Sequence, residues 1–495
     1  MHRSLPTLLF LALLLSACGQ RAYRARLDVD VAPDRLTAAA VAADLDYLHA
    51  AVERIAPLPY LTTDTARVDA AYARVRGRGA QSPLQFYEGI LGILSSYDAS
   101  HYFVRLPAGV YLKEIRTTGH GVLPFRAVLT DRGLLITRTF RGFDKDYRGA
   151  IVHRINGYAA DSLFRDYYRY VGGVEPWKHE QVHDDFHELL YLNGIHGPFT
   201  LEISAPLFGR NAIVTHPGYT YPRRESKEGE PPREVTPRER LARAVDFQMI
   251  DRTGYLRLSK LSGYDYGLYR EFLDSTFRAV RTLKPERIVV DLRGNGGGNS
   301  RLGDWLLDYL TDKPYRTFGG SYFKVSPEAN RNFRYGRANP WLLRQIPYGP
   351  GVRLAFRRHP AERNLYVMQP RERLRKPRAN PLRYAGPVYY VIDNGTYSSA
   401  TALANAVEDY DLGTLIGQPT GNAPTEPGEV VKIVLPHSKH IVSLPSAYFI
   451  RASGDADNLE PTQPDVPVSR ETLRRMELAD IVRTIDSLTA RTTRQ

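Results

Sequence analysis

The sequence predicts a multidomain protein of the α/β class, and three observations lead to this prediction. Residues 36–97 show helical spacing of apolar side chains, and short strand-like segments follow until about residue 206. After residue 255, strand-like and helix-like segments alternate, which is typical of a parallel or mixed sheet covered by helices. With 495 residues, of which 43% are hydrophobic, the chain is long enough for two or three domains.

The first residues have the features of a targeting segment. Arg3 supplies positive charge, and the apolar run that follows is too short to span a bilayer comfortably. This run ends in Leu-Ser-Ala-Cys-Gly at residues 15–19, which resembles a bacterial lipobox. We therefore expect a signal peptide over residues 1–17, a lipidated Cys18 and a tether over residues 18–32. The alternative is an ordinary secretory signal with a chance cysteine.

Cysteine content and charge narrow the cellular setting. Cys18 is the only cysteine, so the mature chain has no thiol for a disulfide, a thiolate nucleophile or a cysteine metal site. We expect a lipid-anchored protein of the bacterial cell envelope, periplasmic or in the outer membrane. The net charge of +13 is compatible with nucleic acid or an anionic membrane surface. For an exported lipoprotein, we interpret it as an arginine-rich solvated surface and expect no nucleic-acid partner.

Residues 33–106 are predicted to form an N-terminal helical segment. It holds three amphipathic helices, at residues 36–55, 64–76 and 82–97. Ser82 is a good N-cap and is followed by proline at the first helical position. The chain then turns into a strand over residues 98–104, which places His101 at a junction between elements.

A β-rich module is expected over residues 118–220. Its strand-like segments lie at residues 134–137, 150–157 and 200–203. The Asn156-Gly157 pair is a strong turn signal. Residues 221–244 are charged and proline-rich, and we interpret them as a linker.

The α/β core is predicted over residues 245–470, followed by a C-terminal helix over residues 471–495. A buried strand at residues 288–292 runs into a glycine loop at 294–298 and then a helix. Further strands and helices are expected at residues 255–258, 269–283, 388–393, 400–407, 415–417 and 430–434. Residues 320–385 are rich in arginine, proline and aromatic residues, and we interpret them as a long excursion from the core.

Three polar features lie where a strand or a helix ends: the glycine loop, Ser398 and the Ser100-His101 pair. A serine at a strand-to-helix turn can point its Oγ out of the sheet, with the positive end of the next helix behind it. The N–H of Ser399 and those of the glycine loop could then stabilise an oxyanion. His101 is the natural base for the serine, because the usual pKa of histidine lies near neutrality.

Simpler interpretations exist for each feature. Ser398 could be only a helix N-cap, and His101 could be a structural histidine. The glycine loop could bind a dinucleotide, since Gly294 and Gly296 match the first two glycines of that fingerprint. Asn299 occupies the place of the third glycine, which weakens the dinucleotide interpretation.

Several motifs in the correct order resemble the C-terminal-processing (tail-specific) serine peptidases and their relative, the tricorn core protease. The motifs are Asp-Leu-Arg-Gly-Asn-Gly-Gly at residues 291–297, Asn-Gly-Thr-Tyr-Ser-Ser-Ala at 394–400, Gly-Gln-Pro-Thr-Gly at 417–421, Ser-His-Tyr at 100–102, and Glu460 followed by Pro-Asp-Val at 464–466. Residues 149–151 and 155–157 resemble part of the PDZ-like domain of these peptidases.

The resemblance implies a fold and a mechanism. The fold is a crotonase-like α/β catalytic core with a PDZ-like β-rich module and an N-terminal helical segment. Ser398 would attack a peptide carbonyl and His101 would take its proton. The N–H groups of Gly296 (or Gly297) and Ser399 would hold the oxyanion.

The third member of the implied triad is an acidic residue. Glu460, acting through Ser100, would orient His101 or balance its charge, with Asp455 and Asp457 as competitors nearby. Glu460 lies closer to the Pro-Asp pair than is usual in the family.

Other departures concern the base. The tail-specific branch uses a lysine in a Gly-Lys-Gly context, where this chain has Gly-Gln-Pro at residues 417–419, and Lys432 is a poor substitute. Thr401 replaces a frequent glutamate, and residues 98–101 read Asp-Ala-Ser-His rather than Asp-Gly-His-Thr. We therefore expect the histidine-based branch.

The sequence thus predicts a serine-type endopeptidase or carboxy-terminal processing peptidase that acts on exported proteins or peptides. The resemblance implies neither a metal nor another cofactor. The polypeptide substrate could be captured by its C-terminus on an edge of the PDZ-like module. The alternative is a catalytically inactive, peptide-binding lipoprotein with a peptidase fold. The sequence does not indicate the oligomeric state.

Overall fold

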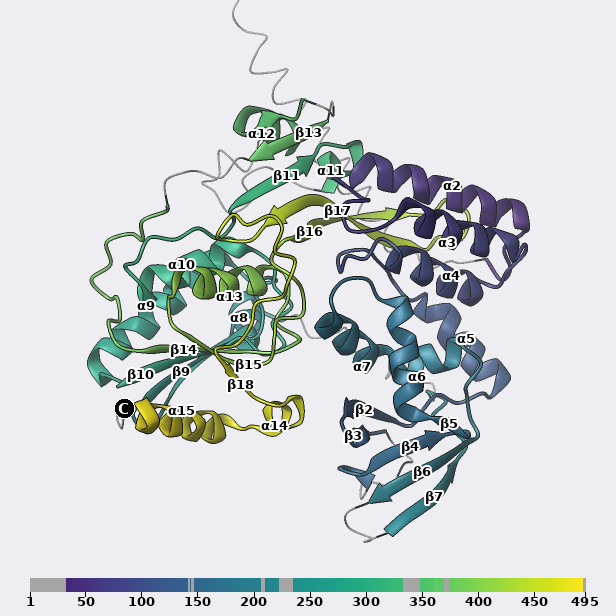
Figure 1. Ribbon diagram of the computed structural model, residues 1–495, viewed down its shortest axis with the longest axis horizontal. Helices are drawn as coiled ribbons and strands as arrows, with labels where there is room; N and C mark the ends of the chain where they lie inside the picture. The colour runs from purple at the N-terminus through teal and green to yellow at the C-terminus, as the bar shows by residue number, and fades with distance from the viewer. Residues whose placement is uncertain are drawn as a thin grey trace, which may run out of the picture.

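The computed structural model describes residues 33–140, 143, 147–205, 210–221, 235–332, 348–360, 362, 364–368 and 374–492. The predicted signal peptide, Cys18 and the tether lie outside these ranges, as does most of the predicted linker. Among the described helices, none combines the length and the apolar character needed to cross a membrane. Two halves lie side by side, with the α/β core in one and the N-terminal helices and the β-rich module in the other (Figure 1).

The three predicted N-terminal helices are confirmed. They are α2 (Ala38–Ile55), α3 (Thr65–Gly77) and α4 (Pro83–Ser95). The side chains of Thr37, Asp64 and Ser82 cap them, and Ser82 forms a reciprocal capping box with Gln85. Each helix therefore begins where a side-chain oxygen satisfies its first free N–H groups.

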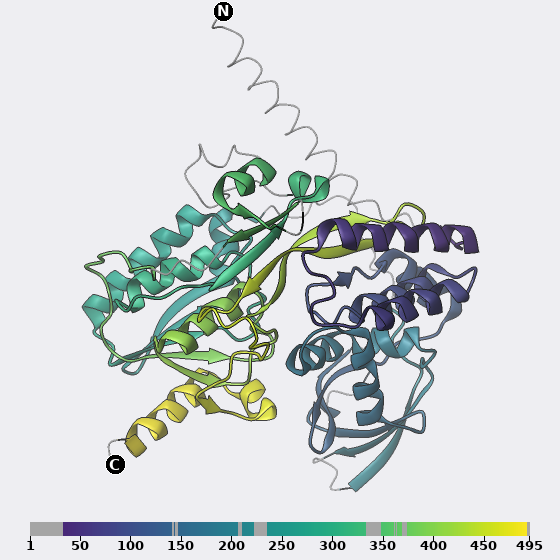
Figure 2. The ribbon, with the colours of Figure 1, turned by 45° about the horizontal axis from the view of Figure 1, so that its top comes forward.

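The N-terminal helices share a hydrophobic core with strands from far along the chain. Strands β16 (Glu426–Val434) and β17 (Ile441–Ile450) extend from the α/β half toward α2 (Figures 1 and 2). Val431 and Leu444 of these strands lie in the same apolar cluster as Leu45 and Val52 of α2. Strand β1 (Phe103–Val104) pairs with β17 and so ties the His101 turn to this sheet.

The β-rich module is an antiparallel sheet covered by helices. Its strands follow the order β2-β3-β4-β6-β7, and β5 pairs with β4. Their bounds are β2 (Phe125–Thr130), β3 (Gly133–Thr139), β4 (Ile151–Ile155), β5 (Tyr158–Ala159), β6 (Phe199–Ala205) and β7 (Arg210–His216). The helices that cover the sheet are α6 (Ala160–Asp166), the 3₁₀ turn η2 (Tyr167–Tyr170) and α7 (Glu175–Leu192), whereas α5 (Ala108–Thr118) packs against α4 and α7. Asn156 and Gly157 have φ of 49° and 83°, as the predicted hairpin turn requires.

The core contains a sheet in the order β18-β15-β14-β10-β9-β8, parallel except for β8. Its strands are β8 (Val245–Ile250), β9 (Thr253–Leu258), β10 (Arg287–Asp291), β14 (Val388–Ile392), β15 (Thr414–Gly417) and β18 (Val466–Pro467). One face is covered by α9 (Tyr266–Leu283), α10 (Ser300–Leu310) and α13 (Ser399–Tyr410). The other is covered by α14 (Arg470–Arg475) and α15 (Leu478–Thr492) (Figure 1).

Three predictions about connecting segments are corrected. The end of the predicted linker forms helix α8 (Pro237–Ala244), because Thr236 and Glu239 make a capping box. The predicted C-terminal helix is two helices, α14 and α15, interrupted at residues 476–477. The expected excursion at 320–385 contributes three strands to a second, antiparallel sheet that contains β17: β11 (Gly320–Lys324), β12 (Arg357–Arg358) and β13 (Leu365–Met368). It also forms two short helices, α11 (Pro327–Asn332) and α12 (Tyr348–Ala355).

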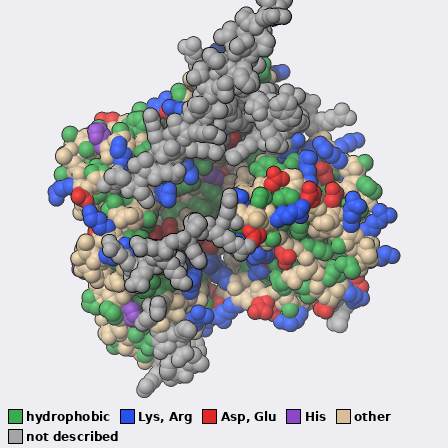
Figure 3. Space-filling model, turned by 180° about the vertical axis from the view of Figure 1, so that it is seen from behind, with side chains coloured by type: hydrophobic (Ala, Val, Ile, Leu, Met, Phe, Trp, Pro, Cys, Tyr) green, Lys and Arg blue, Asp and Glu red, His purple; other side chains and the backbone are tan. Residues whose placement is uncertain are grey.

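Charged side chains are mixed on the surface. On the face seen in Figure 3, lysine and arginine side chains of the described residues are interspersed with aspartate and glutamate. On that face the excess positive charge therefore does not gather into a single continuous patch, in keeping with the interpretation of an arginine-rich solvated surface.

Candidate active site

Ser398 occupies a strained turn between β14 and α13. Its φ of 57° and ψ of −119° lie in a region that L-residues rarely adopt, and its side chain makes no capping hydrogen bond. Strain of this kind persists only where the surrounding structure holds it in place, and it is typical of a nucleophile turn. The N–H of Ser398 donates to Asn422 Oδ1 at 2.6 Å. The simple N-cap interpretation therefore does not fit this residue.

The loop before Ser398 is held by Asp393, at the end of β14. Asp393 Oδ1 accepts the N–H groups of Gly294 at 2.9 Å and Gly395 at 3.0 Å. Burial raises the pKa of Asp393 to about 6, while the hydrogen bond from Gly294 acts in the opposite direction. One carboxyl group thus joins the glycine loop to the serine loop.

His101 lies between the serine and a carboxylate. Its Nε2 is 3.3 Å from Ser398 Oγ, and its Nδ1 is 2.8 Å from Glu426 Oε1. His101 is 5% exposed, and its imidazole stacks on the ring of Tyr397. A neutral ring that donates from Nδ1 to the carboxylate leaves the Nε2 lone pair facing the serine hydroxyl, which is the tautomer a general base needs.

Glu426, at the start of β16, is the acidic partner of His101. Besides His101 Nδ1, its Oε1 receives the hydroxyl of Ser100 at 2.7 Å and the Nδ2 of Asn422 at 2.8 Å. Asn422 Oδ1 also accepts from Ser398 N and Thr401 Oγ1. Ser100, which was expected to link Glu460 to His101, lies beside His101 Nδ1 at 3.3 Å but donates to Glu426. Thr401, where relatives often carry glutamate, donates to Asn422 Oδ1 and so helps to orient Asn422.

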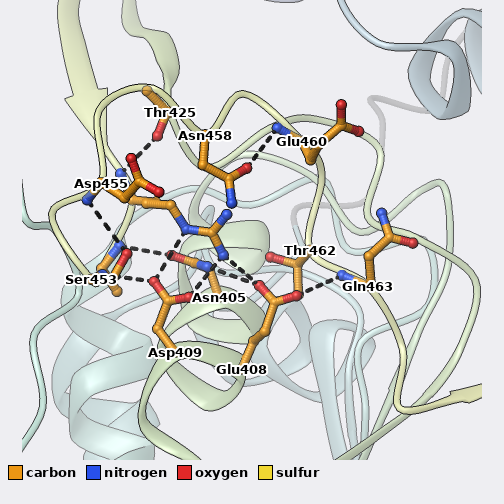
Figure 4. Close-up of polar contacts among 12 residues, drawn as sticks. Asn405, Glu408, Asp409, Thr425, Ser453, Asp455, Asn458, Glu460, Thr462 and Gln463 are labelled. Atoms are coloured by element: carbon orange, nitrogen blue, oxygen red, sulfur yellow. Dashed lines mark hydrogen bonds and ion pairs between the residues drawn. The ribbon is translucent and has the colours of Figure 1, made fainter.

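The prediction that Glu460 orients His101 is wrong in this structure. Glu460 is exposed, its N–H donates to Asn458 Oδ1 at 3.0 Å, and its carboxylate has no partner among the described residues (Figure 4). Its segment follows the end of β17, where buried Arg451 pairs with Glu408 and Asp409 of α13. The network in Figure 4 anchors the end of α13 through Glu408 and Asp409, and Glu460 takes part only through its backbone N–H, which donates to Asn458.

Glu426 and Asn422 were missed by sequence reasoning. Asp455 and Asp457, the competitors that the sequence offers near Glu460, contact neither the base nor the nucleophile. The only local signal for Glu426 is an acidic residue at the start of an otherwise mainly apolar strand. Glu426 lies so far from His101 in the sequence that no periodicity could connect the two residues.

Three backbone N–H groups were predicted as oxyanion donors, those of Gly296, Gly297 and Ser399, and two of them remain available. The N–H of Gly297 donates to Asn295 Oδ1 at 3.0 Å, so it is already used. The N–H groups of Gly296 and Ser399 have no acceptor among the described residues, and Ser399 opens helix α13. Gly296 and Ser399 therefore present the two backbone donors that an oxyanion hole requires.

Gly297 has a different role, which is close approach. A Cβ at this position would lie 2.6 Å from Tyr397 O, 2.7 Å from Ser399 N and 2.9 Å from Ser398 Cβ, and its φ is 82°. The glycine loop and the serine loop also share the hydrogen bond from Tyr397 N to Asn295 O. Only glycine allows the two loops to meet in this way.

We expect Gly297→Ala to lower kcat by about 10³-fold or more, because the added methyl group pushes the nucleophile turn away from the oxyanion donors. Gly157→Ala is the matched control, since Gly157 has φ of 83° and a Cβ added there would meet nothing within 4 Å. Both variants carry the backbone strain, but only Gly297→Ala carries the clash. Steady-state kinetics and thermal melting of both variants separate the two effects, and an active Gly297→Ala enzyme would contradict the close approach.

The dinucleotide interpretation is not supported. The N–H groups of Gly294 and Gly297 are taken by Asp393 and Asn295, and Asn299 caps α10 through Arg301 N. Too few N–H groups remain in the loop to cradle a pyrophosphate. Within the described residues, no group of three or more His, Cys, Asp or Glu side chains is arranged to hold a metal ion.

Lys432 does not take the place of the family lysine. It lies on the exposed side of β16, and the hydrogen-bond partner of Ser398 Oγ is His101. Gln418, where the lysine is usual, donates to Val468 O.

The fold and this site define a serine-type peptidase. Residues 252–468, which run from β9 to β18, match the family model described as peptidase family S41. This match over the catalytic core agrees with the resemblance noted in the sequence.

Solved structures show the same mixed α/β multidomain fold and confirm the predicted fold class. A mutant of CPAF aligns with a TM-score of 0.61 at 15% identity, covering 88% of this chain and 94% of that chain. CPAF complexed with lactacystin aligns with a TM-score of 0.60 at 14% identity, covering 91% and 98% of the two chains. Mature CPAF aligns with a TM-score of 0.56 at 14% identity, covering 86% and 93%. None of the curated proteins matches this sequence significantly.

Proposed function

We propose that this protein is a serine endopeptidase of the histidine-based type, with Ser398, His101 and Glu426 as its triad. The observation that carries the proposal is the continuous chain of contacts from Ser398 Oγ to His101 Nε2, at 3.3 Å, and from His101 Nδ1 to Glu426 Oε1, at 2.8 Å. Nucleophile, base and orienting carboxylate are each within reach of the next, which is the arrangement that acyl transfer by serine needs.

The reaction follows from these contacts. His101 Nε2 accepts the proton of Ser398 as Oγ attacks the carbonyl carbon of the scissile peptide bond. The oxygen that becomes negative is held by the N–H groups of Gly296 and Ser399. Glu426 stabilises the imidazolium, which then gives its proton to the leaving amine, so that an acyl-enzyme remains on Ser398. Water, deprotonated by His101, releases the acyl group and restores the serine.

The mode of substrate capture is part of this proposal. The two outer strands of the module's sheet are β2 and β7, and β2 is covered by α7 at Ala127, whose carbonyl is contacted by His183 Nδ1 at 2.8 Å. An edge that α7 occupies is a poor place to add a peptide strand. This favours internal cleavage of an extended polypeptide over strict recognition of a free C-terminus on β2.

Two fluorogenic peptides of one sequence, one with a free C-terminal carboxylate and one amidated, test the proposal. The unmodified protein should cleave both internally at similar kcat/KM, and Ser398→Ala should cleave neither. A requirement for the free carboxylate would indicate carboxy-terminal processing and contradict the endopeptidase assignment. Binding of both peptides without cleavage would indicate the inactive, peptide-binding alternative.

We further propose that the enzyme is an envelope lipoprotein that acts on exported polypeptides. The lipobox-like segment at residues 15–19 supports this location. Labelled fatty acid should enter the protein in bacterial cells and fail to enter Cys18→Ala, and equal labelling of both would contradict the anchor.

A further inference from the structure

We propose that Trp177, on helix α7 of the β-rich module, is a positioning residue for the catalytic histidine. The proposal rests on the function proposed above. It makes the module a structural part of the active site, because the module supplies one end of a stack of three rings that ends on His101.

The stack runs from the module through the nucleophile loop to the base. The rings of Trp177 and Tyr397 are stacked with centroids 3.9 Å apart and planes at 16°. Those of Tyr397 and His101 are 4.7 Å apart at 24°. Tyr397 directly precedes Ser398, and its hydroxyl contacts Ser100 Oγ at 2.9 Å. One buried aromatic ring therefore touches the base on one face and the module on the other.

The slot for Trp177 is closely fitted. A Cβ at Gly421 would lie 3.2 Å from Trp177 Cε3 and 2.3 Å from Asn394 O, so glycine is needed beneath the indole. Tyr397 is 8% exposed, and burial raises the pKa of its hydroxyl well above the ordinary value. Because the ring of Tyr397 is buried and neutral, its orientation is set by the contact of its hydroxyl with Ser100 and by the two rings that pack against it.

The residues next to Trp177 pack against the loop that carries His101, residues 98–101. A Cβ at Gly172 would lie 2.7 Å from Ala99 O, and one at Gly173 would lie 3.1 Å from Ser100 Cβ. Lys178 Nζ is 3.4 Å from Asp98 Oδ1. In Figures 1 and 2, α7 lies at the side of the module that faces the core.

Through these contacts, residues 172–178 pack against both the loop that carries His101 and the loop that carries Ser398. Movement of α7 away from the core would remove one side of the stack. His101 could then rotate away from the line between Ser398 and Glu426, although none of these three residues belongs to the module. Trp177 acts through Tyr397 and His101 and touches neither of the reacting atoms of the triad.

The test compares Trp177→Ala, Trp177→Leu and Trp177→Phe with the unmodified enzyme. Leucine fills part of the volume without a ring, and phenylalanine restores a ring that can stack. We expect Trp177→Ala and Trp177→Leu to lower kcat by about 10-fold at unchanged KM, and Trp177→Phe to recover most of it, because loss of the stack affects positioning rather than binding. The rate at which a fluorophosphonate labels Ser398 should fall in parallel, and thermal melting reports whether each variant folds.

The outcomes separate this inference from the proposed function. If the unmodified enzyme is labelled at Ser398 and Trp177→Leu is labelled equally fast, the positioning role is contradicted while the peptidase stands. A rise in KM at constant kcat would also contradict it, because Trp177 would then contact substrate. If the folded, unmodified protein is not labelled at all, the proposed function itself fails.

Discussion

Replacing His101 by alanine should lower kcat by about 10³-fold or more, with little change in KM. His101 Nε2, at 3.3 Å, is the side-chain group placed to accept the Ser398 proton, and the loss of a triad base removes stabilisation that exists mainly in the transition state. Steady-state kinetics on an internally cleaved peptide measure the effect.

Lys432→Ala is the matched control for His101→Ala, because Lys432 is the nearest substitute for the lysine of the tail-specific branch and lies on the exposed side of β16. It should keep the activity of the unmodified enzyme. Activity that survives His101→Ala and disappears in Lys432→Ala would show that the base has been assigned to the wrong residue.

Replacing Glu426 by glutamine should lower kcat by about 10²- to 10⁴-fold while the protein stays folded. The amide cannot stabilise the imidazolium as a carboxylate does. Where its NH₂ group takes the place of Oε1, it presents a donor to three donors, His101, Ser100 and Asn422, and accepts none of their hydrogen bonds. Both the orientation and the charge of the base therefore suffer.

Glu460→Gln is the matched control for Glu426→Gln, since it makes the same chemical change on an exposed side chain outside the site. It should leave kcat and the melting temperature essentially unchanged. A large loss of activity in Glu460→Gln, together with a small loss in Glu426→Gln, would restore the family-based assignment and contradict the geometry described above.

Local signals predicted much of the fold. The cap at Ser82, the Asn156-Gly157 turn and the apolar strand before the glycine loop each depend on neighbouring residues, and each appears as expected. The region at 320–385 was misjudged because one of its short strands, β11, gains its stability by pairing with β17, which lies far along the chain. Such pairing leaves no pattern in the strand itself.

The candidate active site was also predictable only in part. The strand-to-helix turn marked Ser398, and the resemblance to the family connected it with His101. Neither could identify Glu426, which meets His101 only because β1 pairs with β17 and β16 lies beside it. Nor could they show that Asn295 uses the N–H of Gly297, since that hydrogen bond depends on the path of the folded loop.

The central claim is that Ser398 is an activated nucleophile, and mass spectrometry after treatment with a fluorophosphonate tests it most directly. The unmodified protein should gain one adduct, located in the peptide that contains Ser398, and Ser398→Ala should gain none. His101→Ala should be labelled far more slowly. A folded protein that gains no adduct, or one that is labelled equally well after Ser398→Ala, would contradict the account.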